Sequence, residues 1–385
     1  MKEKRLQMPA QLNRPIPFID LAAQQKRIRP QLDKAIMRVL DHGKYSLGPE
    51  CFEFEAQLSA YTGAPHVLGC SNGTDALTML LIALDVQSGD AVFVPAFTFV
   101  ATAEVVALRG AVPVFVDVDP VTFNMSPSSL EEAIQTAKEK NMPVKGIISV
   151  DLFGHPAPHD EIEDIAKRHD LWVLIDAAQS LGATYKGKHT VTYGTAATTS
   201  FFPAKPLGGY GDGGAIFTEK ADLAEKLKEI RVHGQTNISR EGEHLGLTGR
   251  LDTLQAAILI EKLKLFPEEV NTRNEVAERY SARLKDVCQV PVVREGCTSV
   301  WAQYTIQVDK RDALLDFLKE KEVPFGVYYK KPLHLHALYQ KGLLGRKLDT
   351  TDALSKNVLS LPMHGYLDQG TQEYIISSLL SFFGK

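Results

Sequence analysis

The sequence predicts an α/β fold, with a large domain whose mainly parallel sheet is sandwiched by helices and a smaller C-terminal α/β domain. Three observations carry this prediction. Apolar, β-branched runs alternate with helical patterns from residue 91 to residue 218. The runs are continuously apolar, which indicates strands buried on both faces, as in parallel sheets. After Arg250 the pattern changes to long amphipathic helices, which indicates a second unit.

The strands of the large domain follow from the apolar runs. They are expected at residues 91–94, 112–116, 146–150, 172–175 and 215–218. Helical patterns at residues 130–140 and 161–169 lie between these strands and fit crossover connections. Residues 91–108 form the most hydrophobic window of the chain, but Pro95 and Glu104 interrupt it. This window is therefore interpreted as a strand, a loop and a helix rather than a membrane span.

The second part of the chain begins with residues 251–287, which predict one or two amphipathic helices with a break at Pro267. Further elements are expected as a strand at 302–308, a helix at 312–321, a strand at 324–329 and a helix at 371–383. The resulting organisation is an N-terminal arm or helix at residues 1–30, a large domain at 31–270 and a small domain at 271–385.

Composition and charge indicate a small partner in a reducing compartment. The 385 residues carry 43 basic and 47 acidic side chains, a balance that argues against nucleic acid as a partner. The four cysteines lack zinc or disulfide spacing, and the N-terminus lacks the apolar stretch of a secretory signal, so a cytoplasmic location is expected. His155 and His159 have HxxxH spacing, but Pro156 and Pro158 prevent the helix that would place both rings on one metal. No metal site is predicted.

The first candidate for chemistry is the segment Cys70–Asp75, which precedes an apolar helical run at residues 76–84. A glycine and small polar residues at a helix start leave backbone N–H groups directed outward, at the positive end of the helix dipole. A phosphate group could bind there. The alternative is that Ser71, Asn72 or Thr74 is an ordinary N-cap, because these residue types are the usual helix caps.

The second candidate is Asp176, which ends the apolar run LWVLID. It therefore places a carboxylate at the carboxyl end of a buried strand, where open α/β sheets bind their ligands. Gln179 follows three residues later and is close enough to share the same pocket. The alternative is that Asp176 caps a helix that starts at Ala177.

The third candidate is Lys205, which lies among Phe202, Pro203 and Pro206. An apolar setting favours the neutral amine, the form that attacks carbonyl groups, so Lys205 is a candidate Schiff-base lysine. The glycines that follow match neither a P-loop nor a dinucleotide fingerprint, because a strand rather than a helix comes next. The alternative is a surface lysine before a flexible hairpin.

Together the three candidates supply what pyridoxal 5'-phosphate requires: an anchor for its phosphate, an anion for its pyridinium nitrogen and an amine for its aldehyde. The segments SNGTDAL, PAFTFVATAEV, IDAAQSLGATYKGK, SFFPAKPLGGYGDGGAI and GRLDTLQAAIL occur in this order. They resemble the DegT/DnrJ/StrS family of nucleotide-sugar aminotransferases, and the resemblance extends over residues 18–367. It implies the type I fold of aminotransferases that use this cofactor.

The resemblance also implies roles for individual residues. Lys205 holds the cofactor covalently and moves the proton, and Asp176 keeps the ring nitrogen protonated. Gln179 lies near the phenolic oxygen of the ring. The aromatic residue that stacks on the ring is Phe99, although strand alternation alone does not distinguish it from Phe97. The phosphate is held by Gly73, Thr74, Asp75 and Ser200.

Active sites of this family lie between two subunits, so the resemblance implies a homodimer with shared sites. The family's Asn-x-Arg segment, which reaches the cofactor phosphate from the neighbouring subunit, here reads Thr248-Gly249-Arg250. A contact from Thr248 is expected there, and Arg250 is available for an anionic group such as a carboxylate. The alternative for Arg250 is a structural role at the start of a long helix.

Within the family, the chain resembles the branch that aminates C3 of UDP-2-acetamido-2-deoxy-3-oxo-glucuronic acid for surface polysaccharides, including the lipopolysaccharide O-antigen. The supporting segments are residues 18–21, 43–50, 302–305 and 361–364. Tyr328 replaces a histidine of that branch, and both Tyr328 and Tyr329 are expected to contact the substrate. The expected donor is glutamate. Alternatives are a C4-keto nucleotide sugar and a non-catalytic regulator that binds the cofactor; Lys205 argues against the related dehydratases, which have histidine at that position.

Overall fold

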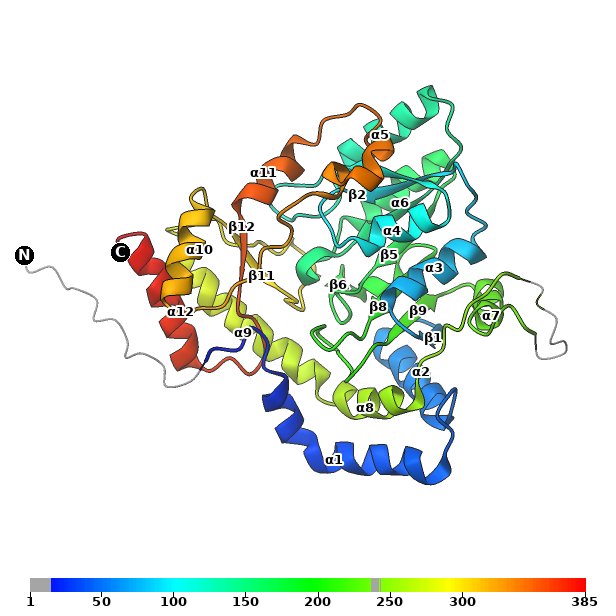
Figure 1. The fold of residues 1–385 in the computed structure, drawn as a ribbon, viewed down its shortest axis with the longest axis horizontal. Helices are drawn as coiled ribbons and strands as arrows, with labels where there is room; N and C mark the ends of the chain where they lie inside the picture. The colour runs from blue at the N-terminus through cyan, green and yellow to red at the C-terminus, as the bar shows by residue number, and fades with distance from the viewer. Residues whose placement is uncertain (1–14, 237–241, 243) are drawn as a thin grey trace, which may run out of the picture.

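The computed structural model describes residues 15–236, 242 and 244–385. Figure 1 shows a large unit built around a sheet and a smaller C-terminal unit beside it. The long helices α1 (Leu21–His42), α8 (Thr253–Leu263) and α9 (Phe266–Leu284) run along the lower side of both, and α9 leads from one unit into the other (Figure 1). The predicted α/β class, with a large sheet domain and a small C-terminal unit, is confirmed.

The large unit is centred on one sheet. Its strands are β1 (His66–Cys70), β2 (Ala91–Pro95), β3 (Val112–Val116), β4 (Val144–Val150), β5 (Trp172–Asp176), β8 (Ala196–Ser200) and β9 (Gly214–Thr218). They are arranged in the order β1-β9-β8-β5-β4-β2-β3. All neighbours are parallel except the pairs that β9 makes with β1 and β8. β9 is antiparallel because a glycine-rich loop, rather than a crossover helix, connects it to β8.

The continuous apolar strands are buried on both faces, as predicted. Val92 and Leu174 contribute to one hydrophobic cluster, whereas their neighbours Phe93 and Ile175 contribute to a second cluster. Helices whose side chains belong to the same hydrophobic cluster cover the same face of the sheet. The first cluster includes α3 (Gly73–Ala83), α4 (Ala101–Leu108) and α7 (Ala221–Ile230), and the second includes α2 (Pro49–Thr62), α5 (Pro127–Glu139), α6 (His159–His169) and α8.

All five strands predicted for the large domain are present in its main sheet, and two more strands of this sheet, β1 and β8, were not predicted. β8 reads Ala-Ala-Thr-Thr-Ser and lacks the large β-branched aliphatic residues that marked the others. β1 reads His-Val-Leu-Gly-Cys, in which Gly69 interrupts the apolar run. Both strands are nonetheless buried, because neighbouring strands and helices cover them. Of the one or two helices predicted at residues 251–287, the structure has two, α8 and α9. The break lies just before Pro267, which is in the first turn of α9, where proline is tolerated.

The C-terminal unit contains β11 (Tyr304–Gln307) paired antiparallel with β12 (Val358–Leu361), against which α10 (Arg311–Glu320) and α12 (Gln369–Phe382) pack. The strand predicted at 324–329 is wrong. Only Gly326 bridges to Ser360, and the chain then leaves the sheet. Its next residues, Tyr328 and Tyr329, pack instead against an aromatic cluster of the large unit.

The N-terminal segment continues into α1, which begins after Asp20. The Asp20 side chain accepts a hydrogen bond from Ala23 N at 2.9 Å, and the helix bends near Ile28 and Pro30. The boundary predicted at residue 30 falls inside α1, close to its kink at Ile28, and the boundary predicted at residue 270 falls near the start of α9. Within the described residues, no helix has the length and apolarity needed to cross a membrane.

Candidate active site

The parallel strands β2, β4, β5 and β8 direct their carboxyl ends to one edge of the sheet, and Asp176 ends β5 at that edge. The Asp176 carboxylate is buried, with 8% of the residue exposed. It accepts hydrogen bonds from Thr102 Oγ1 at 3.2 Å and from the backbone N of Ala178 at 3.1 Å. Burial raises the pKa of Asp176, while these donors and the charge of Lys205 lower it. The helix proposed as the alternative role of Asp176 is absent, because a turn follows.

Lys205 lies in the loop after β8, held there by a hydrogen bond from its backbone N to Phe202 O at 2.8 Å. Burial lowers the pKa of the Lys205 amine, and the charge of Asp176 opposes this shift. The two side chains are therefore close enough to interact electrostatically. The environment favours the neutral amine that carbonyl chemistry needs, so Lys205 is not simply a solvated surface lysine.

The start of α3 combines a cap with free amide groups. Asn72 is the N-cap, and its Oδ1 accepts a hydrogen bond from Asp75 N at 2.8 Å. The Asp75 carboxylate accepts hydrogen bonds from Ser71 Oγ and from Asn72 Nδ2. The amide of Asp75 is thus used by the cap, whereas the amides of Gly73 and Thr74 lie in the first turn and remain for an anion.

Gly73 lies against the end of β8. A Cβ atom at Gly73 would come within 3.0 Å of Ser200 Cβ, so the absence of a side chain allows this approach. The structure therefore brings together Gly73, Thr74 and Ser200, which the resemblance assigned to the phosphate. The Ser200 hydroxyl accepts a hydrogen bond from Phe202 N at 3.2 Å.

The side chain of Gln179 is buried between two polar groups. Its Oε1 accepts a hydrogen bond from Phe153 N at 2.6 Å, and its Nε2 donates to Tyr329 Oη at 3.4 Å. Phe153 and Thr102 were not among the residues predicted for the site. A signal for Thr102 existed, because a polar residue interrupts an apolar helix there, but the backbone donor Phe153 leaves no signal in the sequence.

The two phenylalanines after β2 have different environments. Phe97 is buried among Phe123 and Tyr329, with ring centroids 6.4 and 6.0 Å away. Phe99 is 54% exposed, although large aromatic side chains are normally buried. Phe97 therefore belongs to the core, whereas the Phe99 ring is accessible, and the contact of Phe99 with the cofactor ring stays a prediction.

The segment with Arg250 runs beside the start of α3 of the same chain. Arg250 forms a backbone bridge with Cys70, and Ser71 N donates to Gly249 O at 3.2 Å. Among the residues that the structure describes, no carboxylate forms an ion pair with the Arg250 guanidinium. Thr248 is exposed, and its hydroxyl is 2.7 Å from His233 Nε2.

The substrate candidates Tyr328 and Tyr329 pack together at the edge of this region, with ring centroids 5.9 Å apart. Burial raises the pKa of both phenols, so both stay protonated at neutral pH. Tyr328 also contacts Phe18, at a centroid distance of 6.5 Å. The segment before α1 therefore lies near the candidate site.

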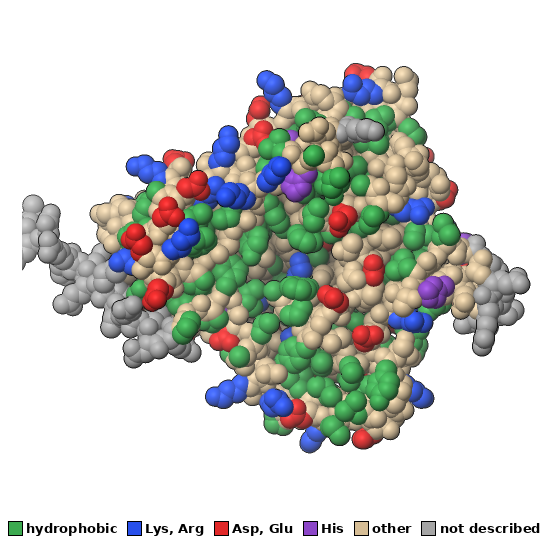
Figure 2. Space-filling model, in the orientation of Figure 1, with side chains coloured by type: hydrophobic (Ala, Val, Ile, Leu, Met, Phe, Trp, Pro, Cys, Tyr) green, Lys and Arg blue, Asp and Glu red, His purple; other side chains and the backbone are tan. Residues whose placement is uncertain are grey.

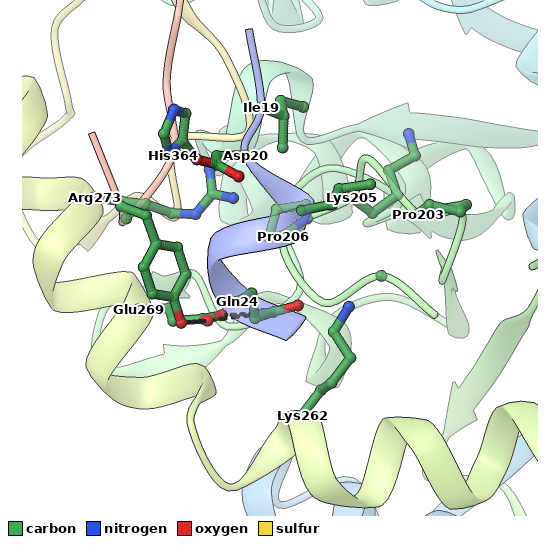
Figure 3. A pocket seen from close by; sticks show the side chains of 14 residues that line it. Ile19, Asp20, Gln24, Pro203, Lys205, Pro206, Lys262, Glu269, Arg273 and His364 are labelled. Carbon is green, nitrogen blue, oxygen red and sulfur yellow. Dashed lines mark hydrogen bonds between the residues drawn. The ribbon is translucent and has the colours of Figure 1, made fainter. Parts of the chain in front are cut away.

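A small polar cavity lies behind Lys205, between α1, α9 and the segment 364–366 (Figure 3). Its volume is about 20 Å³, which is room for one water molecule. The Glu269 carboxylate accepts hydrogen bonds from Gln24 Nε2 at 2.7 Å and from Tyr366 Oη at 2.5 Å. His364 lines the cavity, and neither of its ring nitrogens has a partner among the described residues. This cavity was not predicted.

The residues present fit pyridoxal phosphate. Lys205 supplies an amine whose neutral form is favoured, and Asp176 supplies a buried carboxylate that interacts with it. The cradle at Gly73, which a Cβ would fill, offers amides for the phosphate. Fold and site together define the class of type I aminotransferases that depend on pyridoxal phosphate.

The chain belongs to the DegT/DnrJ/EryC1/StrS aminotransferase family, whose model matches residues 26–380. It is 46% identical to UDP-2-acetamido-2-deoxy-3-oxo-D-glucuronate aminotransferase of Pseudomonas aeruginosa over 367 residues, which cover 94% of this chain and 99% of that protein. The resemblance inferred from the motifs and the prediction of an aminotransferase are confirmed.

Solved structures agree with this assignment. A family aminotransferase from Brucella abortus superposes with a TM-score of 0.94 at 46% identity, over 96% of this chain and 100% of that one. The Bacillus subtilis protein ntda, solved with bound cofactor PMP, superposes with a TM-score of 0.88 at 30% identity, over 98% and 88% of the two chains. The predicted cofactor agrees with the one in this relative, since PMP is its aminated form.

Proposed function

We propose that this chain is an aminotransferase that uses pyridoxal phosphate to move an amino group from glutamate to C3 of a UDP-linked 3-keto sugar. The proposed sugar is of the UDP-2-acetamido-2-deoxy-3-oxo-glucuronate type, made for surface polysaccharide such as O-antigen. The observation that carries the proposal is the interaction of Lys205 with Asp176 at the carboxyl edge of the sheet. The identity to the Pseudomonas aeruginosa enzyme over nearly the whole chain supports the sugar.

When bound, pyridoxal phosphate supplies an aldehyde that captures amines and a ring that withdraws electrons from the adjacent carbon. The protein residues supply the rest. The Asp176 carboxylate, which accepts hydrogen bonds from Thr102 and Ala178, would supply the negative charge that keeps the ring nitrogen of the cofactor protonated. The neutral Lys205 amine would accept a proton from one of the two carbons bonded to the transferred nitrogen and return it to the other. The free amides of Gly73 and Thr74 hold the phosphate at the positive end of α3.

Arg250 supports a uronic acid as the substrate. Its guanidinium has no ion-pair partner among the described residues. The family resemblance implies that this segment reaches the active site of the neighbouring subunit. A substrate carboxylate would satisfy this charge with a bidentate hydrogen-bonded pair. Arg250→Gln is expected to raise the KM for the uronic-acid substrate at least tenfold, because such a charged hydrogen bond contributes about 1.5–3 kcal/mol.

We also propose that the chain forms a homodimer. Hydrophobic side chains lie on the part of the surface formed by α1, α2 and α8, in the lower part of Figure 2. Met37 and Leu40 of α1 and Phe52 of α2 are 53%, 45% and 53% exposed. Exposed apolar groups concentrated on neighbouring helices are typical of protein interfaces, and a second copy of the chain would cover them.

The test is turnover by the purified protein with pyridoxal phosphate, glutamate and either UDP-2-acetamido-2-deoxy-3-oxo-glucuronate or a 4-keto nucleotide sugar. We expect amination of the 3-keto uronate by the wild-type protein and its loss in Lys205→Ala. Preference for the 4-keto sugar would replace the proposed substrate with the alternative one. Cofactor binding without turnover of any keto sugar would favour a regulator, and undiminished turnover by Lys205→Ala would refute the mechanism.

A further inference from the structure

The turn after β4 holds a bulky residue in an unusual backbone conformation. Phe153 has φ 61° and ψ 9°, in the left-handed region, and its side chain is fully buried. This region costs a non-glycine residue roughly 1–2 kcal/mol. For a buried aromatic residue, such a conformation persists only where the surrounding structure determines it.

The side chain of Asn124 holds the turn from one side. Its Oδ1 accepts a hydrogen bond from Leu152 N, and its Nδ2 donates to His155 O, both at 2.9 Å. These two bonds fix Leu152, which immediately precedes Phe153, and His155, which lies two residues after it. The Phe153 ring packs against Phe123, with centroids 5.4 Å apart. Both the backbone and the ring of Phe153 are therefore fixed.

The segment between β10 (Cys297–Thr298) and β11 holds the same turn from the other side. Ser299 Oγ donates to Gly154 O at 2.8 Å, and Gln303 N donates to Phe153 O at 3.4 Å. A Cβ at Gly154 would come within 2.8 Å of Trp301 N, so the two segments are in close contact. The chain that leads into the C-terminal unit thus helps to set the conformation of Phe153.

The N–H of Phe153 determines which way the Gln179 amide faces. Oxygen and nitrogen of a glutamine amide have nearly the same shape, and their positions follow from their partners. A backbone N–H can only donate, so the atom 2.6 Å from Phe153 N must be Oε1. The Nε2 donor then faces the other way, toward Tyr329 and the candidate site.

We infer that Phe153 is a positioning residue: its left-handed backbone presents its N–H to Gln179 and thereby directs the Nε2 donor of Gln179 into the cofactor site. This inference rests on the proposed function, since the donor is useful there for the negatively charged phenolic oxygen of the cofactor. A reversed amide would present an oxygen to that charge and repel it. The turn and its two supports keep the reversed orientation from forming.

The test compares Phe153→Val with Phe153→Asn in the cofactor-loaded enzyme. Both remove the aromatic ring, but valine is β-branched and disfavours the left-handed region, whereas asparagine tolerates it. We expect the midpoint pH of the cofactor absorbance change to rise by about one unit in Phe153→Val and to stay near the wild-type value in Phe153→Asn. Gln179→Glu, which keeps the acceptor but lacks the donor, should shift the midpoint in the same direction as Phe153→Val.

A second measurement does not depend on the cofactor. Gln179→Ala removes the acceptor, so hydrogen exchange at the Phe153 amide should become at least tenfold faster. Ser59→Ala removes a side-chain hydrogen bond to Ala64 O outside this turn, so it should leave the Phe153 amide protected. Equal midpoints in Phe153→Val and Phe153→Asn, or unchanged exchange in Gln179→Ala, would overturn the inference. A wild-type protein without any cofactor absorbance would refute the proposed function instead, and the exchange experiment would still decide the role of Phe153.

Discussion

At the scale of single residues, the site depends on groups that control the charge of others. The Asp176 carboxylate is buried, and burial alone disfavours its charged form. Thr102 offsets this by donating to one carboxylate oxygen, and the backbone N of Ala178 offsets it by donating to the other. These two donors therefore oppose the effect of burial on the charge of Asp176, although its pKa stays above the ordinary value, and Thr102 is the donor that a substitution can remove.

Thr102→Val keeps the shape of the side chain and removes its donor. We expect kcat to fall about ten- to a hundredfold, because a hydrogen bond to a charged group contributes about 1.5–3 kcal/mol. The acidic limb of the pH–rate profile should also move to higher pH, since the pKa of Asp176 rises when a donor is lost. Thr102→Ser keeps the hydroxyl and serves as the control. A valine variant with wild-type kcat and pH profile would show that Thr102 does not support Asp176.

Lys262 is a buried base behind the site, over the Tyr210 ring at 4.7 Å. Burial lowers its pKa from 10.5 to about 8. Below pH 8 the lysine is protonated both folded and unfolded, so its buried charge destabilises the fold, and this cost disappears as the pH rises toward 10.5. A shift of this size corresponds to a cost on the order of 3 kcal/mol.

Lys262→Met is therefore expected to raise the stability relative to wild type at pH 7, and this advantage should vanish near pH 10.5. The measurement is urea unfolding of both proteins at the two pH values. Lys264→Met is the matched control, because Lys264 is exposed at the end of the same helix and pairs with Glu261 at 2.7 Å. A pH-independent difference between Lys262→Met and wild type would contradict the lowered pKa.

At the scale of elements, the two units are joined where the turn 151–155 meets the segment 299–303. Gly154 has φ 95°, and its carbonyl accepts hydrogen bonds from Ser299 Oγ at 2.8 Å and Val300 N at 3.2 Å. The same turn supports Gln179 through Phe153. A change in the contact between the two units is thus expected to reach the site through this turn, without any contact to the ligand itself.

Gly154→Ala tests this contact, and Gly187→Ala is its control. Both glycines have positive φ, 95° and 81°, so both variants lose about 1 kcal/mol in backbone conformation. Only at Gly154 would the new Cβ meet backbone, with Trp301 N at 2.8 Å, while nothing lies within 4 Å at Gly187. We expect Gly154→Ala to lower the free energy of unfolding by at least about 2 kcal/mol more than the control, as overpacking does. Equal losses, measured by chemical denaturation, would contradict the proposed contact.

At the scale of the whole molecule, the sequence predicted what depends on local pattern. Strands such as β2 and β5 were identified because runs of apolar residues are buried on both faces, and Asp176 and Lys205 because a charge stands out in an apolar setting. β8 was missed because Ala-Ala-Thr-Thr-Ser becomes a strand only through its neighbours. Phe153 and the Glu269 cavity were missed for a related reason: they join segments far apart in the chain, and no local pattern marks such contacts.

Two copies of the chain are expected to share each active site. If each site combines Lys205 of one copy with Arg250 of the other, neither Lys205→Ala nor Arg250→Ala alone forms a complete site. Mixed dimers of the two variants regain one complete site each. Because half of randomly re-formed dimers are mixed, unfolding and refolding an equal mixture should restore about a quarter of the wild-type activity. The activity is measured at a substrate concentration below the wild-type KM, where a site without Arg250 contributes little. Each variant refolded alone serves as the control. A mixture no more active than the sum of its parts would mean that Lys205 and Arg250 serve the same site from the same copy.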